Sequence, residues 1–272
     1  MKSSANPAIV TRGSAVKRRL TAALCCALAF AGALWAQPPR AAVVPVVRPE
    51  ILRVAGHDPA AFTQGLAFAD TVLYESTGLV GRSSLRRVDP ATGRVLASVP
   101  VPDVFAEGIA VFGGELVQLT WQNGFALRYE FPSLRAKPAM YRYAGEGWGL
   151  ASDSAGFIMS NGSDTLYFRD GGFGVTRALP VTYYGRPLAQ LNELEYARGH
   201  VYANVWYRNF IAEISAADGK VRRVIDCAEL VGIEKPASGE NVLNGIAYCE
   251  RKDEWYLTGK NWKNMFVVKI PK

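Results

Sequence analysis

The sequence predicts an all-β fold, a five-bladed β-propeller, and three observations support this prediction. A short motif recurs five times at intervals of 41 to 52 residues, which is the spacing of repeats that each form one β-sheet. Each repeat contains strand-forming segments separated by turn residues, four of them in a complete repeat. The last repeat lacks its fourth segment, and one additional segment precedes the first repeat.

The recurring motif is a polar or aromatic residue at the start of a short apolar run. The five runs read QGLAF, EGIAV, WGLAS, NELEY and NGIAY, and they begin at residues 64, 107, 148, 192 and 244. The intervals between them are therefore 43, 41, 44 and 52 residues. In a propeller the first strand of every blade lines the central channel. We therefore expect the five residues that begin these runs to share one mouth of that channel.

The remaining strands of each repeat follow in a constant order. After the first run, a turn rich in Gly, Asp or Ser leads to a second apolar segment, which predicts a β-hairpin. Third and fourth strands are expected next, such as SLRRV and RVLASV in the first repeat and FALRYE and KPAMYRY in the second. The turns DPATGRV at 89–95 and SAADGKV at 215–221 occupy equivalent places in two repeats, which supports true repetition.

The ring is expected to close through a strand that precedes the repeats. The fifth repeat ends at MFVVKI without a fourth strand, whereas the segment from Ile51 to Val54 has no partner of its own. We expect this segment to complete the last blade, because closure removes free sheet edges. A β-sandwich is the alternative, but a sandwich does not require five equivalent four-strand units.

The first 36 residues have the pattern of a secretory signal peptide. Lys17, Arg18 and Arg19 precede an apolar stretch at 20–34 that is followed by small residues. A membrane-spanning helix is the alternative, but the stretch is shorter than the ~20 residues that a bilayer requires. We expect residues 1–36 to be removed, leaving a periplasmic or secreted protein with no attachment to the membrane.

Removal of this segment also removes most of the positive charge. The chain has 31 Lys and Arg residues against 24 Asp and Glu residues. Residues 1–36 contain five of the bases and no acid, so 26 bases and 24 acids remain. A nucleic-acid partner is therefore not expected. Residues 37–50 contain four prolines and are expected to form an extended leader before a single propeller domain at 51–272.

The sequence gives little indication of a metal or cofactor. It contains two histidines, His57 and His200, and no HExxH, CxxC, G-x-S-x-G or phosphate-binding glycine motif. We therefore expect a site that works without a cofactor. Cys227 and Cys249 either form a disulfide or pack as free thiols, and their positions in different strands favour packing.

Two rings of residues are expected to meet at one mouth of the channel. The first ring begins the five runs, and the second ends the following strands at Thr77, Trp121, Gly162, Trp206 and Lys260. Glu107 is the only carboxylate that begins a run, and aromatic neighbours would raise its pKa toward the range used for proton transfer. Amide and ammonium groups suit a carbonyl oxygen that gains charge, and tryptophans suit a small ligand. Each residue alone also has a structural explanation, as a core tryptophan or as a cap of a turn.

Six strings in this order carry a resemblance to a known family: HDPAAFTQGL, YESTGLVGRSSLRRVD, EGIAVFGGELVQLTWQNG, GEGWGLASD, LNELEYARGHVYANVW and LNGIAY with LTGKNW. From about Ile51 to Ile270 the chain resembles the plant and bacterial type of glutaminyl-peptide cyclotransferase. The resemblance implies a five-bladed propeller that converts N-terminal glutamine of peptides or proteins to pyroglutamate with loss of ammonia. It also implies catalysis without the zinc of the unrelated animal-type enzyme. We further expect a monomer.

The resemblance implies a role for particular residues. Glu107 would be the general acid and base, and the substrate would bind to Phe62, Gln64, Trp121, Trp148, Asn192, Trp206 and Lys260. Lys263 is an alternative to Lys260, and Asn244 is expected only to cap its turn. Two other classes of protein stay open, a propeller that binds peptides without catalysis and a metal-dependent propeller of the lactonase type.

Overall fold

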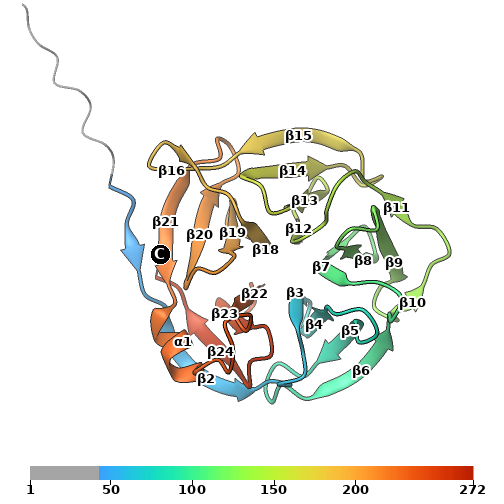
Figure 1. Cartoon of the computed structure of the whole chain (residues 1–272), viewed down its shortest axis with the longest axis horizontal. Helices are drawn as coiled ribbons and strands as arrows, with labels where there is room; N and C mark the ends of the chain where they lie inside the picture. The colour runs from blue at the N-terminus through green and yellow to red at the C-terminus, as the bar shows by residue number, and fades with distance from the viewer. Residues whose placement is uncertain (1–42, 272) are drawn as a thin grey trace, which may run out of the picture. The chain divides into compact units, whose positions relative to one another are not determined.

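Five β-sheets surround a central axis in the computed structural model, which describes residues 43–271 (Figure 1). The innermost strands of the sheets, β3, β7, β12, β18 and β22, stand closest to the axis. This part of the chain is a five-bladed β-propeller, as the sequence predicts. The predicted signal peptide at 1–36 lies outside the described residues.

The first three blades each begin with an inner strand at the axis and continue outward. The first blade contains β3 (Thr63–Ala69), β4 (Val72–Thr77), β5 (Ser84–Val88) and β6 (Val95–Pro100). The second contains β7 (Ala106–Phe112), β8 (Glu115–Thr120) and β9 (Phe125–Glu130), with β10 (Arg135–Ala136) and β11 (Tyr141–Arg142) outside. The third contains β12 (Leu150–Ser152), β13 (Phe157–Met159), β14 (Thr165–Arg169) and β15 (Val175–Pro180).

The last two blades include strands from the N-terminal side of the repeats. The fourth contains β18 (Leu191–Ala197), β19 (His200–Val205), β20 (Phe210–Ser215), β21 (Val221–Asp226) and β1 (Val46–Val47). The fifth contains β22 (Leu243–Cys249), β23 (Glu254–Gly259), β24 (Asn264–Lys269) and β2 (Glu50–Gly56). A hairpin of β16 (Thr182–Tyr183) and β17 (Arg186–Pro187) precedes the fourth blade, and α1 (Ala228–Glu234) precedes the fifth.

The strand β2 pairs antiparallel with β24, from Glu50 opposite Lys269 to Gly56 opposite Asn264. The strand β1 pairs in parallel with β21 at the outer edge of the fourth blade. Residues 46–50, which the sequence placed in the leader, therefore belong to the outer edge of the propeller. The N-terminal and C-terminal segments of the described chain thus share one sheet.

The hydrophobic core consists of layers between neighbouring blades. Five clusters of buried side chains each combine residues of two adjacent sheets. The inner strands are buried along most of their length, whereas β6 is exposed at five of six positions. Because each blade buries both of its faces, the inner and middle strands are rich in apolar residues instead of alternating with polar ones.

The predicted similarity of two turns is confirmed, whereas one predicted outer strand is wrong. The turns at 89–95 and 215–221 are alike, because Gly93 and Gly219 both have positive φ angles of 72° and 71° and donate to the carbonyl four residues earlier. Most of the expected strand KPAMYRY at 137–143 does not form: only Tyr141 and Arg142 pair with β9, and Pro138 has no N–H group with which to pair. The outer edge of the second blade consists instead of the short strands β10 and β11.

Cys227 and Cys249 are buried free thiols, which agrees with packing instead of a disulfide. Cys227 directly precedes α1, and Cys249 ends β22. Within residues 43–271, the structure contains no helix with the length and apolar character needed to cross a membrane.

Candidate active site

A backbone irregularity recurs where the inner strands begin. The pairing with the second strand shifts register beside Gln64, Glu107, Asn192 and Asn244. Such β-bulges redirect a side chain out of the alternating pattern of a strand. In the third blade Trp148 lies just before β12. The repeated motif of the sequence is therefore the point at which each inner strand reaches the channel mouth.

Glycines bring these inner strands into direct contact with one another. A Cβ atom on Gly108 would lie 2.4 Å from the backbone nitrogen of Leu150, and one on Gly149 would lie 2.0 Å from the carbonyl oxygen of Asn192. No larger residue fits between the strands at these two positions. The side chains that precede the glycines are thereby gathered into one small space.

That space is a cavity of about 170 Å³ at one end of the channel. All eight residues that the sequence assigns to the pocket line it, together with two further residues, Phe105 and Glu240. The lining consists of Phe62, Gln64, Phe105, Glu107, Trp121, Trp148, Asn192, Trp206, Glu240 and Lys260. Lys263 is exposed, so Lys260 is the lysine of the cavity.

Glu107 is 4% exposed and hydrogen-bonded on one oxygen. Gln64 donates from Nε2 to Glu107 Oε1 over 3.0 Å, and Asn244 donates to Gln64 Oε1 over 3.1 Å. Asn244 also donates to the Thr63 carbonyl oxygen over 2.9 Å, so it orients Gln64 across the boundary between blades. The expectation that Asn244 only caps its turn is therefore too narrow.

The surroundings of Glu107 favour its neutral form. Burial is the largest influence and raises the pKa of Glu107 well above its ordinary value. The ammonium of Lys260 and the hydrogen bond from Gln64 act in the opposite direction, while the carboxylate of Glu146 raises the pKa further. Glu107 is thus a carboxyl group that can hold a proton closer to neutral pH than an exposed glutamate does.

Lys260 points its ammonium group toward aromatic rings. Its Nζ atom lies 4.9 Å from the ring centroid of Phe62 and 5.7 Å from that of Trp206. Burial lowers the pKa of Lys260, against the opposing charges of Glu107 and Glu240. In its charged form this group makes cation–π contacts with both rings beside the buried acid.

The three tryptophans of the cavity differ in the use of their indole N–H groups. Trp121 and Trp148 both donate to Glu146 Oε2 over 2.9 Å. The buried Nε1 of Trp206 has no hydrogen-bond partner within residues 43–271. Trp206 is the indole that remains able to donate to a ligand, and its ring meets that of Trp148 edge to face at 5.4 Å.

Gly162 makes room for one of these indoles. Alignment of the repeats predicts Gly162 in the second ring of the mouth, where other blades carry Trp121, Trp206 or Lys260. A Cβ atom at Gly162 would lie 2.6 Å from Cζ2 of Trp148. The ring of Trp148 therefore fills the place that a side chain at residue 162 would occupy.

Three residues of the site were not predicted from the sequence: Phe105, Glu146 and Glu240. Phe105 precedes Glu107 by two residues as Phe62 precedes Gln64, so a comparison of the first two repeats could have found it. Glu146 precedes Trp148 by two residues, but its contact with Trp121 of another blade leaves no periodic signal. Glu240 lies in the irregular segment between α1 and β22, outside the repeat.

Fold and site together define a five-bladed propeller with a small cavity in which a buried carboxyl group, a lysine and three tryptophans converge. The family model for glutamine cyclotransferase matches residues 22–270. The chain belongs to the glutamine cyclotransferase family.

Two relatives extend this result. The chain is 38% identical over 226 residues to a glutaminyl-peptide cyclotransferase of Arabidopsis thaliana, a match that covers 81% of this chain and 71% of the relative. It is also similar to the crystal structure of Myxococcus xanthus glutaminyl cyclase, with a TM-score of 0.80 and 34% identity. That match covers 84% of this chain and 98% of the Myxococcus chain.

Among the residues that the structure describes, no group of three or more His, Cys, Asp or Glu side chains lies together in an arrangement that could hold a metal ion. The buried carboxyl group of the cavity is surrounded instead by an amide, an ammonium group and aromatic rings.

Proposed function

We propose that this protein is a glutaminyl-peptide cyclotransferase that uses Glu107 as general acid and base and needs no metal ion. Its substrates would be peptides or proteins with N-terminal glutamine, and its products pyroglutamate and ammonia. The family and both relatives support the class of reaction. The observation that carries the proposal is the buried Glu107 beside Lys260 in a small cavity with tryptophan walls.

The reaction requires one proton to move between two nitrogens. The substrate's α-amine attacks its own γ-carboxamide carbon, a C–N bond forms, and the bond to the departing amide nitrogen breaks. The attacking nitrogen must lose a proton, and the departing nitrogen must gain one to leave as ammonia. A cavity of this size also favours the folded side chain that places the two reacting atoms together.

Glu107 is suited to move that proton. Burial raises its pKa above that of an exposed glutamate, which favours its use as a group that both accepts and donates a proton. Oε1 accepts from Gln64, whereas Oε2 has no hydrogen-bond partner in the described part of the chain. We assign Oε2 of the ionised Glu107 to take the proton from the amine, and the neutral carboxyl group formed in this way to give the proton to the leaving nitrogen. Gln64 donates to Glu107 and accepts from Asn244, so one of its roles is to orient Glu107.

Other groups would stabilise the oxygen of the γ-carboxamide as it gains charge. Lys260, Asn192 and the indole N–H of Trp206 line the cavity and are donors of the kind that hold an oxyanion. An unpaired buried N–H costs about 1–3 kcal/mol. A substrate oxygen that accepts from Trp206 would remove this cost on binding.

An ammonia-release assay with a dipeptide that begins with glutamine tests the proposal. Glu107→Gln should lower kcat by about 10²- to 10⁴-fold, because the positioned acid and base is lost. Glu130→Gln is a matched control, because Glu130 lies in the same blade and pairs with the exposed Arg135. A near-normal rate for Glu107→Gln would exclude the proton-transfer role.

The same assay tests whether the reaction needs a metal ion. Activity should persist after treatment with EDTA and dialysis, and a loss that a divalent ion restores would contradict metal independence. Binding of the dipeptide without release of ammonia would identify a peptide-binding propeller instead.

The signal sequence predicted at 1–36 supports a periplasmic or secreted location, which mass analysis of the exported protein would test. Light scattering would test the expected monomer.

A further inference from the structure

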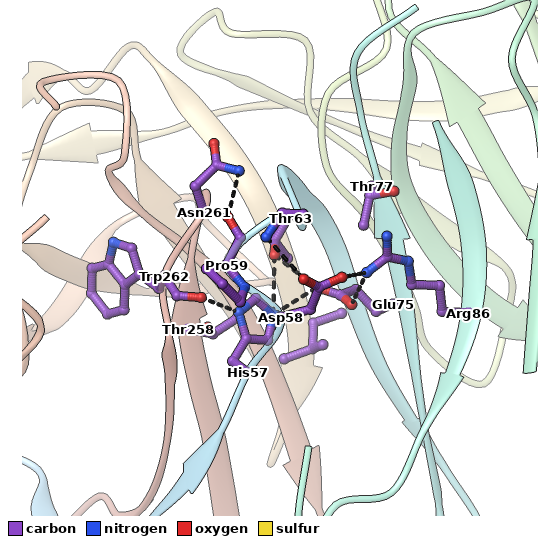
Figure 2. Close-up of polar contacts among 12 residues, drawn as sticks. His57, Asp58, Pro59, Thr63, Glu75, Thr77, Arg86, Thr258, Asn261 and Trp262 are labelled. Atoms are coloured by element: carbon purple, nitrogen blue, oxygen red, sulfur yellow. Dashed lines mark hydrogen bonds and ion pairs between the residues drawn. The ribbon is translucent and has the colours of Figure 1, made fainter. Parts of the chain in front are cut away.

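The boundary between the fifth and first blades joins two loops that carry residues of the cavity. One loop leads from β2 to β3 and ends at Phe62, with Gln64 following in β3, and the other leads from β23 to β24 and begins at Lys260. Backbone hydrogen bonds connect them, from His57 N to the carbonyl of residue 263 over 2.8 Å and from Asn261 N to the carbonyl of residue 61 over 2.7 Å. Figure 2 shows a further bond from the Asn261 side chain to the Pro59 carbonyl, at 3.0 Å.

A buried ion pair lies at this boundary (Figure 2). His57 Nε2 is 2.8 Å from Glu75 Oε1 of β4, and His57 Nδ1 is 2.7 Å from the carbonyl oxygen of Trp262. The side chains of His57 and Glu75 are 3% and 1% exposed. Both ring nitrogens thus face an oxygen that only accepts hydrogen bonds. The Thr63 hydroxyl also lies 3.4 Å from Nε2, but it donates to Glu75 Oε1 over the shorter distance of 2.7 Å. An imidazole ring satisfies both oxygens only in its charged form, with a proton on each nitrogen.

The same carboxylate holds the end of the loop nearest to the cavity. Thr63 donates from Oγ1 to Glu75 Oε1 over 2.7 Å. Thr63 lies between Phe62 and Gln64, so Glu75 anchors both the first residue of the loop, His57, and the residue beside the two that line the cavity. The structure therefore connects the ion pair to the orientation of Phe62 and Gln64 through a single hydroxyl group.

The charges around the ring favour its protonated form. They are the negative charges of Glu75 of β4 and of Asp58 in the same loop. Arg86 of β5 donates to Asp58 over 2.9 Å and lies 3.7 Å from Glu75, so its positive charge keeps these two carboxylates ionised. Burial by itself lowers the pKa of His57, but Glu75, the Trp262 carbonyl and Asp58 outweigh it and raise that pKa above its ordinary value. Burial likewise opposes ionisation of Glu75, yet His57, Arg86 and Thr63 lower its pKa overall.

We propose that the charged pair of His57 and Glu75 is a positioning device for the active site, so that turnover requires protonated His57. The pair holds the loop that ends at Phe62, and with it Gln64 at the start of β3, against the loop with Lys260. Loss of the proton leaves one nitrogen with a lone pair facing an oxygen, which breaks one of the two contacts. A displacement of about 1 Å at the cavity can lower kcat by about 10²-fold.

The effect on stability has a defined sign. Because the pKa of His57 is raised on folding, its contribution is fully present below the ordinary value of about 6.5 and is lost as pH rises through the folded value. The melting temperature should therefore decrease across the same interval of pH as the proposed loss of turnover.

Histidine NMR on the intact protein tests the proposal directly. The chain has only two histidines, so a spectrum of His200→Gln, compared with wild type, assigns the signals of His57. His200 lies in the hairpin of β18 and β19, which makes this variant the control for loss of a histidine elsewhere. We expect His57 to titrate above pH 6.5 and kcat to fall with the same midpoint, in wild type and in His200→Gln alike. A kcat that stays constant through the titration of His57 would overturn the proposal.

Glu75→Gln separates this effect from the titration of Lys260. The variant removes the charge that favours protonated His57 and keeps an oxygen able to accept from Thr63. Its alkaline loss of kcat should move to lower pH together with the NMR midpoint of His57, whereas a merely structural role would lower kcat equally at every pH. If the variant does not fold, the comparison of the NMR midpoint of His57 with the midpoint of the fall in kcat, both in the wild-type protein, still tests the proposal. The proposal rests on the cyclisation activity for its kinetic readout, but the NMR and melting data test the pair even if no ammonia is released.

Discussion

Replacement of Gly162 by alanine should disable the active site through a single methyl group. The Cβ atom would lie 2.6 Å from Cζ2 of Trp148, whereas carbon atoms in contact are about 3.5–4.0 Å apart. The indole must therefore retreat by about 1 Å, a misplacement that can cost about 10²-fold in rate. The backbone conformation, with a φ of 80°, adds strain of roughly 1–2 kcal/mol for any residue with a side chain.

Gly199 provides a matched control for the backbone strain. It also has a φ of 80°, but a Cβ atom there would have no neighbour within 4 Å. Urea denaturation should show a similar loss of roughly 1–2 kcal/mol for Gly199→Ala and at least this loss for Gly162→Ala. Only Gly162→Ala should lose about 10²-fold in kcat/KM for ammonia release. If Gly162→Ala turns over at the rate of Gly199→Ala, the ring of Trp148 does not form a wall on which the reaction depends.

Three further variants test the charges of the cavity. Lys260→Met should move the acid limb of the kcat/KM profile to higher pH, because the ammonium lowers the pKa of Glu107; a midpoint that stays in place would contradict this coupling. Glu146→Gln should move the same limb to lower pH, because it removes a charge that raises that pKa, and tryptophan fluorescence should show whether the two indoles it holds have shifted. Glu240→Gln should reduce kcat/KM more for a peptide that begins Gln-Lys than for one that begins Gln-Glu, in low salt, because a carboxylate at the cavity attracts a basic second residue; equal effects on both peptides would refute this.

The periodicity of the sequence was sufficient to predict the fold and to bring distant residues to one mouth of the channel. Gln64, Glu107 and Asn192 were found because each occupies the β-bulge that the repeated motif encodes. The absence of strand pairing at Pro138 could have been predicted from its missing N–H group. The repeat pattern predicts the position of a residue when the strands of a single blade determine that position.

The repeat pattern does not predict residues whose position depends on contacts between blades or on inserted segments. Glu146 matters because two indoles from different blades converge on one of its oxygens, which no single repeat reveals. Glu240 belongs to the segment with α1 that lengthens the interval between Asn192 and Asn244 to 52 residues. The pairing of His57 with Glu75 likewise depends on how the fifth blade meets the first.

The pairing of β2 with β24 has a consequence for the order in which the protein folds. Contacts between residues so distant in sequence form slowly, because the chain between them must first be ordered. Phe62 and Lys260 come from the two sides of this pairing, so we expect the cavity to be complete only after β2 has paired with β24. We therefore expect a nascent chain that has not yet produced β24 to lack a complete cavity, and activity to depend on the pairing of β2 with β24.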